Sequence, residues 1–253
     1  EPEVLYTGLH HAREAMSAHN LIFFMQYILQ NYTADNRVAT IINNRELYFI
    51  PCINPDGWNY NCTTNPGGGG MHRKNRKDFG VTQTNKGVDL NRNYSVGFAF
   101  DNVGSSPLEN SDTYRGPSAF SENETQALRA FVNGRQFGMA LNYHSFGQLW
   151  VRPYGVSTVT PTATDNLILN TTGSLFTKYN CFKVGDDLAT VGYEVNGVSD
   201  DWFMAGDAAS RPPGFEKIYS FTPEIGQTFW PTASLIIPLA REMMFSNFQI
   251  AYT

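Results

Sequence analysis

The chain has 253 residues, of which 42% are hydrophobic, 14% aromatic and 16% charged. This composition excludes a disordered or coiled-coil chain, and the length favours a single α/β domain with a large core. The formal net charge of −5 provides no basic surface, so we expect no nucleic-acid partner. Because no apolar run reaches the ~18 residues that a membrane helix needs, we expect a soluble protein without a membrane partner.

Three cysteines, Cys52, Cys62 and Cys181, form no Cys-x-x-Cys pair. This pattern indicates neither a cysteine-based zinc site nor a disulfide-dense scaffold, although one bridge remains open. No signal peptide precedes the first apolar run, which suggests a trimmed or processed N-terminus.

The first half of the chain alternates apolar runs with helical periodicity. We expect a strand at 3–8, helices at 14–31 and 36–44, and a strand at 47–53. The string Asn54-Pro55-Asp56-Gly57 then predicts a turn. Regular periodicity fades from Gly57 to about Ser118, and so long an irregular stretch inside a compact domain is usually functional.

The second half returns to regular elements. Ser121 and Glu124 have the spacing of a capping box and predict the start of a helix. Further elements are expected as strands at 138–144, 148–152 and 219–224 and helices at 161–179 and 234–251. The alternation predicts a mixed, mostly parallel twisted sheet with helices on both faces. Sites in such folds lie at the carboxyl ends of the strands.

Candidate metal ligands lie where predicted strands end. His11 and Glu14 are three residues apart at a strand-to-helix junction, where one helical turn can bring both side chains to one point. His144 follows the apolar run 139–143 and could complete the three protein ligands of a catalytic zinc. Alone, His-x-x-Glu is a weak signal, and a single histidine at a strand end is more often structural.

Short motifs occur in a fixed order along almost the whole chain. They are HARE at His11, NPDG at Asn54, RKNR at Arg73, GVDLNRNY at Gly87, YRGPSAFSENET at Tyr114, NYHSFGQLWVRPYG around His144, SDDW at Ser199 and YSFTPE ending at Glu224. In this order they resemble the zinc carboxypeptidases of the pancreatic A/B type. The resemblance implies that His11, Glu14 and His144 bind one Zn²⁺ and that the protein is a zinc metallocarboxypeptidase, which removes the C-terminal residue of peptides or proteins.

The resemblance also implies two catalytic residues. Glu224 resembles the family's catalytic glutamate, since a carboxylate beside the attacking water can take its proton and later pass it to the departing amine. Without the zinc set, a surface acid would be the better interpretation. Arg76 resembles the arginine that polarises the scissile carbonyl, a task suited to a permanent charge. We expect its neighbours Lys74 and Lys77 to be solvated.

Three further residues resemble the family's substrate anchor. Asn91 and Arg92 resemble the pair that holds the substrate's terminal carboxylate, to which a guanidinium can make two parallel hydrogen bonds. Tyr193, in a loop that looks flexible, resembles the mobile tyrosine that closes over this carboxylate. Asp89 resembles a carboxylate that orients a zinc histidine. The remaining histidines have no matching role and are expected to be structural or on the surface: His10, His19 and His72.

The side-chain pocket is implied by two positions. Asp200 matches the base of the pocket, where an acid resembles the B-type enzymes that remove C-terminal Lys or Arg, because a buried carboxylate needs a cationic partner. Gly155 matches a pocket wall and would leave room for a long side chain. Leu188 and Val198 are apolar wall candidates. We therefore predict a preference for Lys or Arg with tolerance of apolar residues.

The resemblance leaves some properties of the chain open. It implies a secreted or periplasmic monomer whose catalytic domain covers residues 1–253 but lacks two strands that normally precede the first zinc ligand. A zinc amidase acting on cell-wall or acylated peptides would have the same metal centre. An inactive carboxypeptidase-like binding module is a further alternative, although it would be expected to lose a ligand or Glu224.

Overall fold

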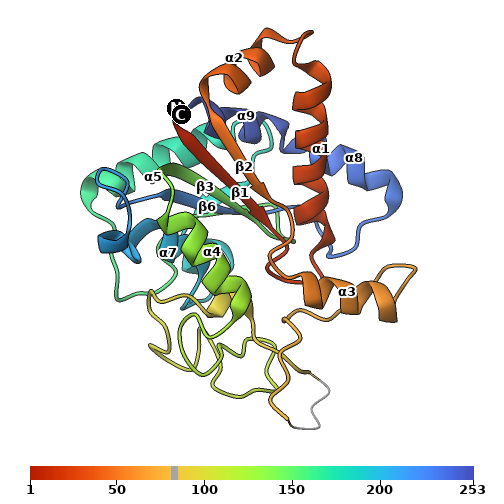
Figure 1. Ribbon diagram of the computed structural model, residues 1–253, viewed down its shortest axis with the longest axis vertical. Helices are drawn as coiled ribbons and strands as arrows, with labels where there is room; N and C mark the ends of the chain where they lie inside the picture. Colours follow the sequence, from red (N-terminus) through yellow and green to blue (C-terminus); the bar gives the residue numbers. More distant parts are fainter. Residues whose placement is uncertain (81–84) are drawn as a thin grey trace.

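A single mixed sheet organises the protein, whose computed structural model describes residues 1–80 and 85–253 (Figure 1). Across this sheet the strands are β2 (Glu46–Ile50), β1 (Glu3–Gly8), β3 (Phe137–Tyr143), β6 (Tyr219–Glu224), β4 (Leu149–Val151) and β5 (Lys183–Gly185). Neighbouring strands are parallel except that β4 runs antiparallel to β6. The predicted mixed, mostly parallel sheet is therefore confirmed.

Helices cover both faces of this sheet. They are α1 (Ala15–Asn31), α2 (Asn36–Asn44), α3 (Pro55–Thr64), α4 (Asn123–Asn133), α5 (Ala163–Phe176), α6 (Asp187–Thr190), α7 (Ser199–Ala205), α8 (Ala233–Glu242) and α9 (Met244–Tyr252). Short 3₁₀ turns lie at Leu90–Arg92 and Ala208–Ser210. In Figure 1, α1 and α8 lie on one side of the strands and α4 and α7 on the other.

The alternation of side chains along β1 explains this two-sided arrangement. Val4 and Tyr6 belong to the hydrophobic cluster that includes residues of α1, α5, α8 and α9. Leu5, between them, belongs to the cluster with residues of α4 and α7. Because successive residues of a strand point to opposite faces, a strand buried on both faces reads as a continuous apolar run.

The string from Asn54 to Gly57 begins a helix, so the predicted turn is wrong. The Asn54 side chain accepts a hydrogen bond from the Gly57 backbone N–H at 2.9 Å, and Pro55 occupies the first helical turn. An Asn cap followed by proline is a recognised helix start, because proline's fixed φ suits the first turn and its missing N–H costs nothing there. This signal was present in the sequence.

The predicted capping box also does not form. Glu122, one residue later than expected, is the N-cap residue of α4 and makes no side-chain cap hydrogen bond. The Ser121 hydroxyl instead donates to the Glu122 carboxylate at 2.8 Å. Glu122 in turn accepts from the Asn75 amide at 2.7 Å, so this acid ties α4 to the long irregular segment.

Lys74 is buried, which corrects the prediction that it would be solvated. Its ammonium donates to the backbone carbonyls of Asn85, Glu109 and Ser111 at 2.6, 2.7 and 2.9 Å. These bonds use all three ammonium donors, as a buried charge requires. A single side chain therefore joins three parts of the segment between α3 and α4.

The remaining differences concern short elements and ends. The predicted closing helix is divided at Met243 into α8 and α9, and the sequence pattern did not reveal β5, α6 or α7. Cys52, Cys62 and Cys181 are free thiols. Among the described residues, no helix combines the length and apolar character needed to cross a bilayer.

Candidate metal centre and substrate cavity

Two adjacent parallel strands bring the three predicted metal ligands together. Gly8 at the end of β1 pairs with Tyr143 at the end of β3, so His11 and His144 follow neighbouring strand ends. Glu14 is the N-cap residue of α1 but makes no side-chain cap hydrogen bond, which leaves its carboxylate to face the two histidines. The helix N-terminus also favours a negative charge at this position.

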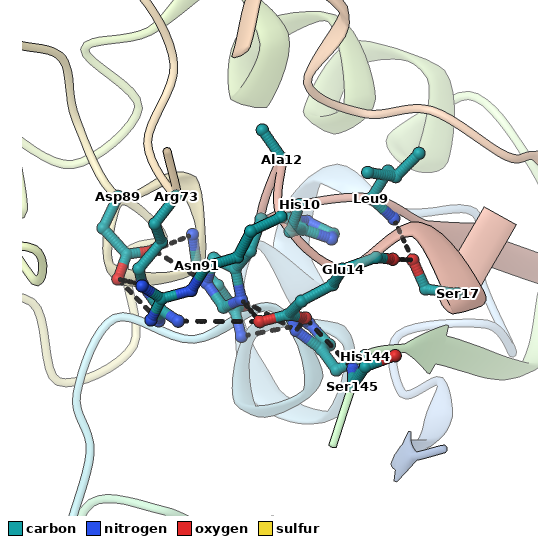
Figure 2. A network of polar contacts seen from close by, with 12 residues as sticks. Leu9, His10, Ala12, Glu14, Ser17, Arg73, Asp89, Asn91, His144 and Ser145 are labelled. Atoms are coloured by element: carbon teal, nitrogen blue, oxygen red, sulfur yellow. Dashed lines mark hydrogen bonds and ion pairs between the residues drawn. The ribbon is translucent and has the colours of Figure 1, made fainter. Parts of the chain in front are cut away.

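The three ligand side chains converge on one point. The Nδ1 atoms of His11 and His144 lie 3.0 Å apart, and the Glu14 oxygens lie 2.8 and 2.9 Å from them. All three residues are buried, and one ligand atom from each lies within 4.8 Å of the others. Two ring nitrogens and a carboxylate oxygen directed at one another are the donors that a divalent cation needs. Figure 2 shows Glu14 between Arg73 and His144.

Asp89 contacts the nitrogen of His11 that faces away from the other two ligands. Its Oδ1 lies 3.0 Å from His11 Nε2, and its Oδ2 accepts hydrogen bonds from Arg73 at 2.8 and 3.0 Å. Such a carboxylate fixes the orientation of the ring and directs its other nitrogen toward the metal. The other ring nitrogen of His144 contacts the side-chain amide of Asn142 at 3.0 Å.

Glu224 ends β6 and lines the same cavity as the three ligands. Its position is fixed by its neighbours, because the His144 N–H donates to Pro223 O and the Ile225 N–H donates to His144 O, both at 2.9 Å. Desolvation in the cavity and the negative charge of Glu14 raise the pKa of Glu224 to about 8. A carboxyl group with a raised pKa can hold a proton between two transfer steps.

The structure brings Arg73, and not Arg76, to this cavity. Arg73 Nη1 lies 3.7 Å from a Glu14 oxygen, and the side chain lines the cavity. Arg76 stacks on the ring of Tyr60 at 3.9 Å and lines a separate hollow beside α3. The motif carries an arginine at each end, so its spacing could not decide between them. The sequence-based choice of Arg76 therefore does not fit the observed geometry.

The predicted substrate anchor lies at the same cavity. Asn91 and Arg92 are buried in the 3₁₀ turn, where Asn91 Oδ1 accepts from the Ser199 N–H at 2.9 Å. The Arg92 guanidinium donates to Gly104 O and Asn91 O at 2.8 and 2.7 Å, which holds its plane in place. Tyr193 lines the cavity and is 53% exposed, so its ring has space in which to move.

The pocket residues fall into two cavities. Asp200 and Val198 line the cavity of about 250 Å³ that contains the metal ligands. Gly155 and Leu188 line a neighbouring cavity of about 360 Å³, and Leu188 is 60% exposed. Gly155 also lies against Asp187 and Val195, which both line the cavity of the metal ligands. The space beside Gly155 is already occupied, because a Cβ there would lie 2.5 Å from an oxygen of Asp187.

A family model described as zinc carboxypeptidase matches residues 1–246. The chain belongs to the zinc carboxypeptidase family. It is 30% identical to carboxypeptidase B of Astacus astacus over 253 residues, covering 96% of this chain and 77% of that protein. It is 31% identical to bovine (Bos taurus) carboxypeptidase A1, covering 92% of this chain and 54% of that protein.

The solved structures of this family agree with the fold. Bovine thrombin-activatable fibrinolysis inhibitor, in complex with tick carboxypeptidase inhibitor, matches with a TM-score of 0.81 and 25% identity over 98% of this chain and 81% of that chain. The family membership makes the chain a hydrolase of the zinc metallocarboxypeptidase class, with zinc as its cofactor. The chain spans about half the length of several relatives, bovine carboxypeptidase A1 among them.

The residues at the candidate centre fit a catalytic zinc ion. Two imidazoles and one carboxylate are a donor set that zinc accepts in hydrolases, and three protein ligands leave a position for a reactant. Bound there, zinc supplies a Lewis acid that polarises a carbonyl and lowers the pKa of water. His11, Glu14 and His144 would hold the ion, because their donor atoms face one another across a few ångströms.

A pair of variants tests which arginine serves the reaction. Arg73→Gln is expected to lower kcat about a hundredfold, because it removes the guanidinium nearest the metal ligands from the cavity. Arg76→Gln makes the same change outside the cavity and should leave kcat nearly unchanged. Steady-state kinetics of both variants on one peptide would measure this, and the opposite ranking would restore the sequence-based choice.

The histidines without a predicted metal role make local contacts. His10 is buried with its Nε2 2.7 Å from the Tyr94 hydroxyl, and His19 and His72 contact backbone carbonyls. Arg73 and Asp187 are among the cavity residues to which sequence reasoning gave no role. The Arg-Lys-Asn-Arg motif contained the signal for the first, whereas Asp187 lies in a short stretch without a recognised motif.

Proposed function

We propose that this protein is an exopeptidase that hydrolyses the C-terminal peptide bond of peptides or proteins, with a preference for Lys or Arg and tolerance of apolar residues. One observation carries the proposal. A single cavity is lined by the metal ligands, by Glu224, by Arg92 and Tyr193 and by the buried Asp200. This set can bind a terminal carboxylate, a side chain and the bond between them.

Glu224 would serve as the general base. Its carboxylate would take a proton from the attacking water and later pass that proton to the departing amine. Arg73 would face the oxygen of the scissile carbonyl as negative charge develops on it. Its bonds to Asp89 hold the guanidinium in place before substrate arrives, so little reorganisation is needed during the reaction.

Arg92 and Tyr193 would bind the substrate's terminal carboxylate. The Arg92 side chain is held by two backbone carbonyls, and a fixed guanidinium can form charge-assisted hydrogen bonds to a carboxylate. The Tyr193 ring is 53% exposed and lines the cavity, so it has space in which to move over the carboxylate. Closure of Tyr193 over the carboxylate would then shield the site from water.

Asp200 would select the terminal side chain. It is 3% exposed, burial raises its pKa, and its Oδ2 has no hydrogen-bond partner among the described residues. A cationic substrate side chain would offset the cost of this buried acid. Val151, Val195 and Val198 also line the cavity, which supports tolerance of apolar ends. The family resemblance further supports a secreted or periplasmic monomer.

Matched peptides test the proposal. We expect release of the last residue from a peptide with a free C-terminus, with Arg and Lys released faster than Leu and Leu faster than Glu. The C-terminally amidated twin should be cleaved at least about tenfold more slowly, since it cannot form the charged contact to Arg92. Mass spectrometry of the products would measure both comparisons.

Two outcomes would contradict this proposal. Equal cleavage of the amidated twin would remove the exopeptidase assignment and favour the amidase alternative, and fastest release of Glu would remove the proposed pocket chemistry. Dialysis against 1,10-phenanthroline should abolish cleavage and added zinc should restore it, which separates the metal-dependent reaction from a contaminating protease.

A further inference from the structure

Two buried carboxylates, and not one, line the cavity beside the metal ligands. Asp200 is the second residue of α7, and Asp187 is the first residue of α6. They are 3% and 8% exposed. In each, one oxygen has no hydrogen-bond partner among the described residues. Leaving a buried carboxylate oxygen unpaired is costly, so a ligand that supplies donors would recover free energy at this place.

The third acid nearby is satisfied within the protein. Both oxygens of Asp201 accept the Gly155 backbone N–H, at 3.0 and 3.1 Å. Asp187 lies close to the same glycine, and a Cβ on residue 155 would come within 2.5 Å of the unpaired oxygen of Asp187. Asp201 is therefore a structural acid. Asp187 occupies the space that a side chain at residue 155 would otherwise fill.

The charges around Asp187 and Asp200 are not balanced by the protein. Burial and the charge of Asp200 raise the pKa of Asp187, and burial raises the pKa of Asp200. The positive charge of Arg92 acts on Asp187 in the opposite direction, but among the described residues no ion pair joins the two. A cationic ligand would supply the missing partner.

We propose that Asp187 and Asp200 together form a binding site for a guanidinium, so that the cavity binds C-terminal arginine in preference to lysine. This inference rests on the proposed function and extends it to the choice between the two basic residues. A guanidinium presents five donors in a planar fork and can bond to both carboxylates at once. An ammonium is a compact charge that is more strongly hydrated, and it gains less from two acceptors in different directions.

The test replaces one carboxylate and compares substrates. Asp187→Asn is expected to lower the ratio of kcat/KM for an arginine-ended peptide to that for its lysine-ended twin by about tenfold. Asp186→Asn is the matched control, because it makes the same change one residue away at the N-cap of α6, outside this cavity, and asparagine can keep the cap. Its ratio should equal that of the wild-type protein. Asp187→Ser provides a second uncharged variant in case Asn is not tolerated.

A binding measurement keeps this inference separate from the proposed function. Thermal unfolding of the wild-type protein and of both Asp187 variants would be followed with added L-arginine, L-lysine or L-norleucine. We expect the largest stabilisation of the wild-type protein with L-arginine, and its loss in the Asp187 variants. The melting temperatures without ligand show whether the variants are folded.

Each failure has its own signature. If peptides are cleaved as proposed but the arginine-to-lysine ratio is unchanged in both Asp187 variants, this inference is wrong and the proposed function stands. If no peptide is cleaved while L-arginine still stabilises the protein through Asp187, the proposed function is wrong and the guanidinium-binding site stands. Equal loss of arginine, lysine and leucine release in the Asp187 variants would show that Asp187 only supports the cavity wall and would overturn the inference.

Discussion

Substitution of His144 by alanine is expected to abolish zinc binding and to lower hydrolysis to background, a loss of at least about 10⁴-fold. His144 contributes one of three convergent donors, and its ring nitrogen lies 2.9 Å from Glu14 and 3.0 Å from His11. Without it, two ligands remain, which is fewer than a catalytic zinc site uses. Metal content measured by mass spectrometry, together with activity after zinc is added back, would check this result.

His19→Ala is the control for this experiment. His19 lies on α1, beyond the metal ligand Glu14, and its Nδ1 contacts the Ala15 carbonyl of the same helix. The variant should bind one zinc per chain and retain activity. Stoichiometric zinc in the purified His144→Ala protein would contradict the assignment of the metal centre.

Substitution of Glu224 by glutamine is expected to lower kcat about 10³-fold while zinc content stays at one per chain. Glutamine has nearly the same shape but cannot accept a proton from water, so the change removes proton transfer and leaves the metal ligands in place. KM should change much less than kcat, because Arg92 and Tyr193 are untouched. Steady-state kinetics and metal analysis on the same sample would measure both.

Glu242→Gln is the matched control for Glu224. Glu242 is a partly buried carboxylate at the end of α8 whose pKa is also raised by burial, but it lies outside the cavity. It should retain wild-type kinetics. If Glu224→Gln lost zinc, or kept most of its kcat, the carboxylate would not be the general base.

Much of the fold could be predicted because the long elements have strong patterns. The continuous apolar runs of β1 and β3 are typical of strands that are buried on both faces. Helices before and after them in the sequence pack on the two faces of the sheet. Short elements were harder to predict, since α6 has four residues and β5 three, too few for a periodic signal. The start of α3 was misread because Asn-Pro is common both in turns and at helix starts.

The site could be predicted as far as ordered motifs reach. The two histidines and Glu14 lie at strand ends, where the chain direction fixes their position, and the structure brings them together. The arginine of the cavity was harder to predict. Arg73 and Arg76 lie three residues apart in an irregular segment, where no periodicity indicates which of the two faces the site. Asp187 was missed because its role depends on Gly155 and Asp200, which are distant in sequence and adjacent only after folding.

The Lys74 ammonium holds together the irregular segment between α3 and α4 by donating to backbone carbonyl oxygens, which every amino acid possesses. Asn85, Glu109 and Ser111 contribute main-chain oxygens, so their side chains can change during evolution while all three bonds persist. The donor itself has no such freedom, because a planar guanidinium directs its hydrogens differently from an ammonium. Related proteins could therefore diversify the sequence of this irregular segment without releasing the backbone that Lys74 holds together.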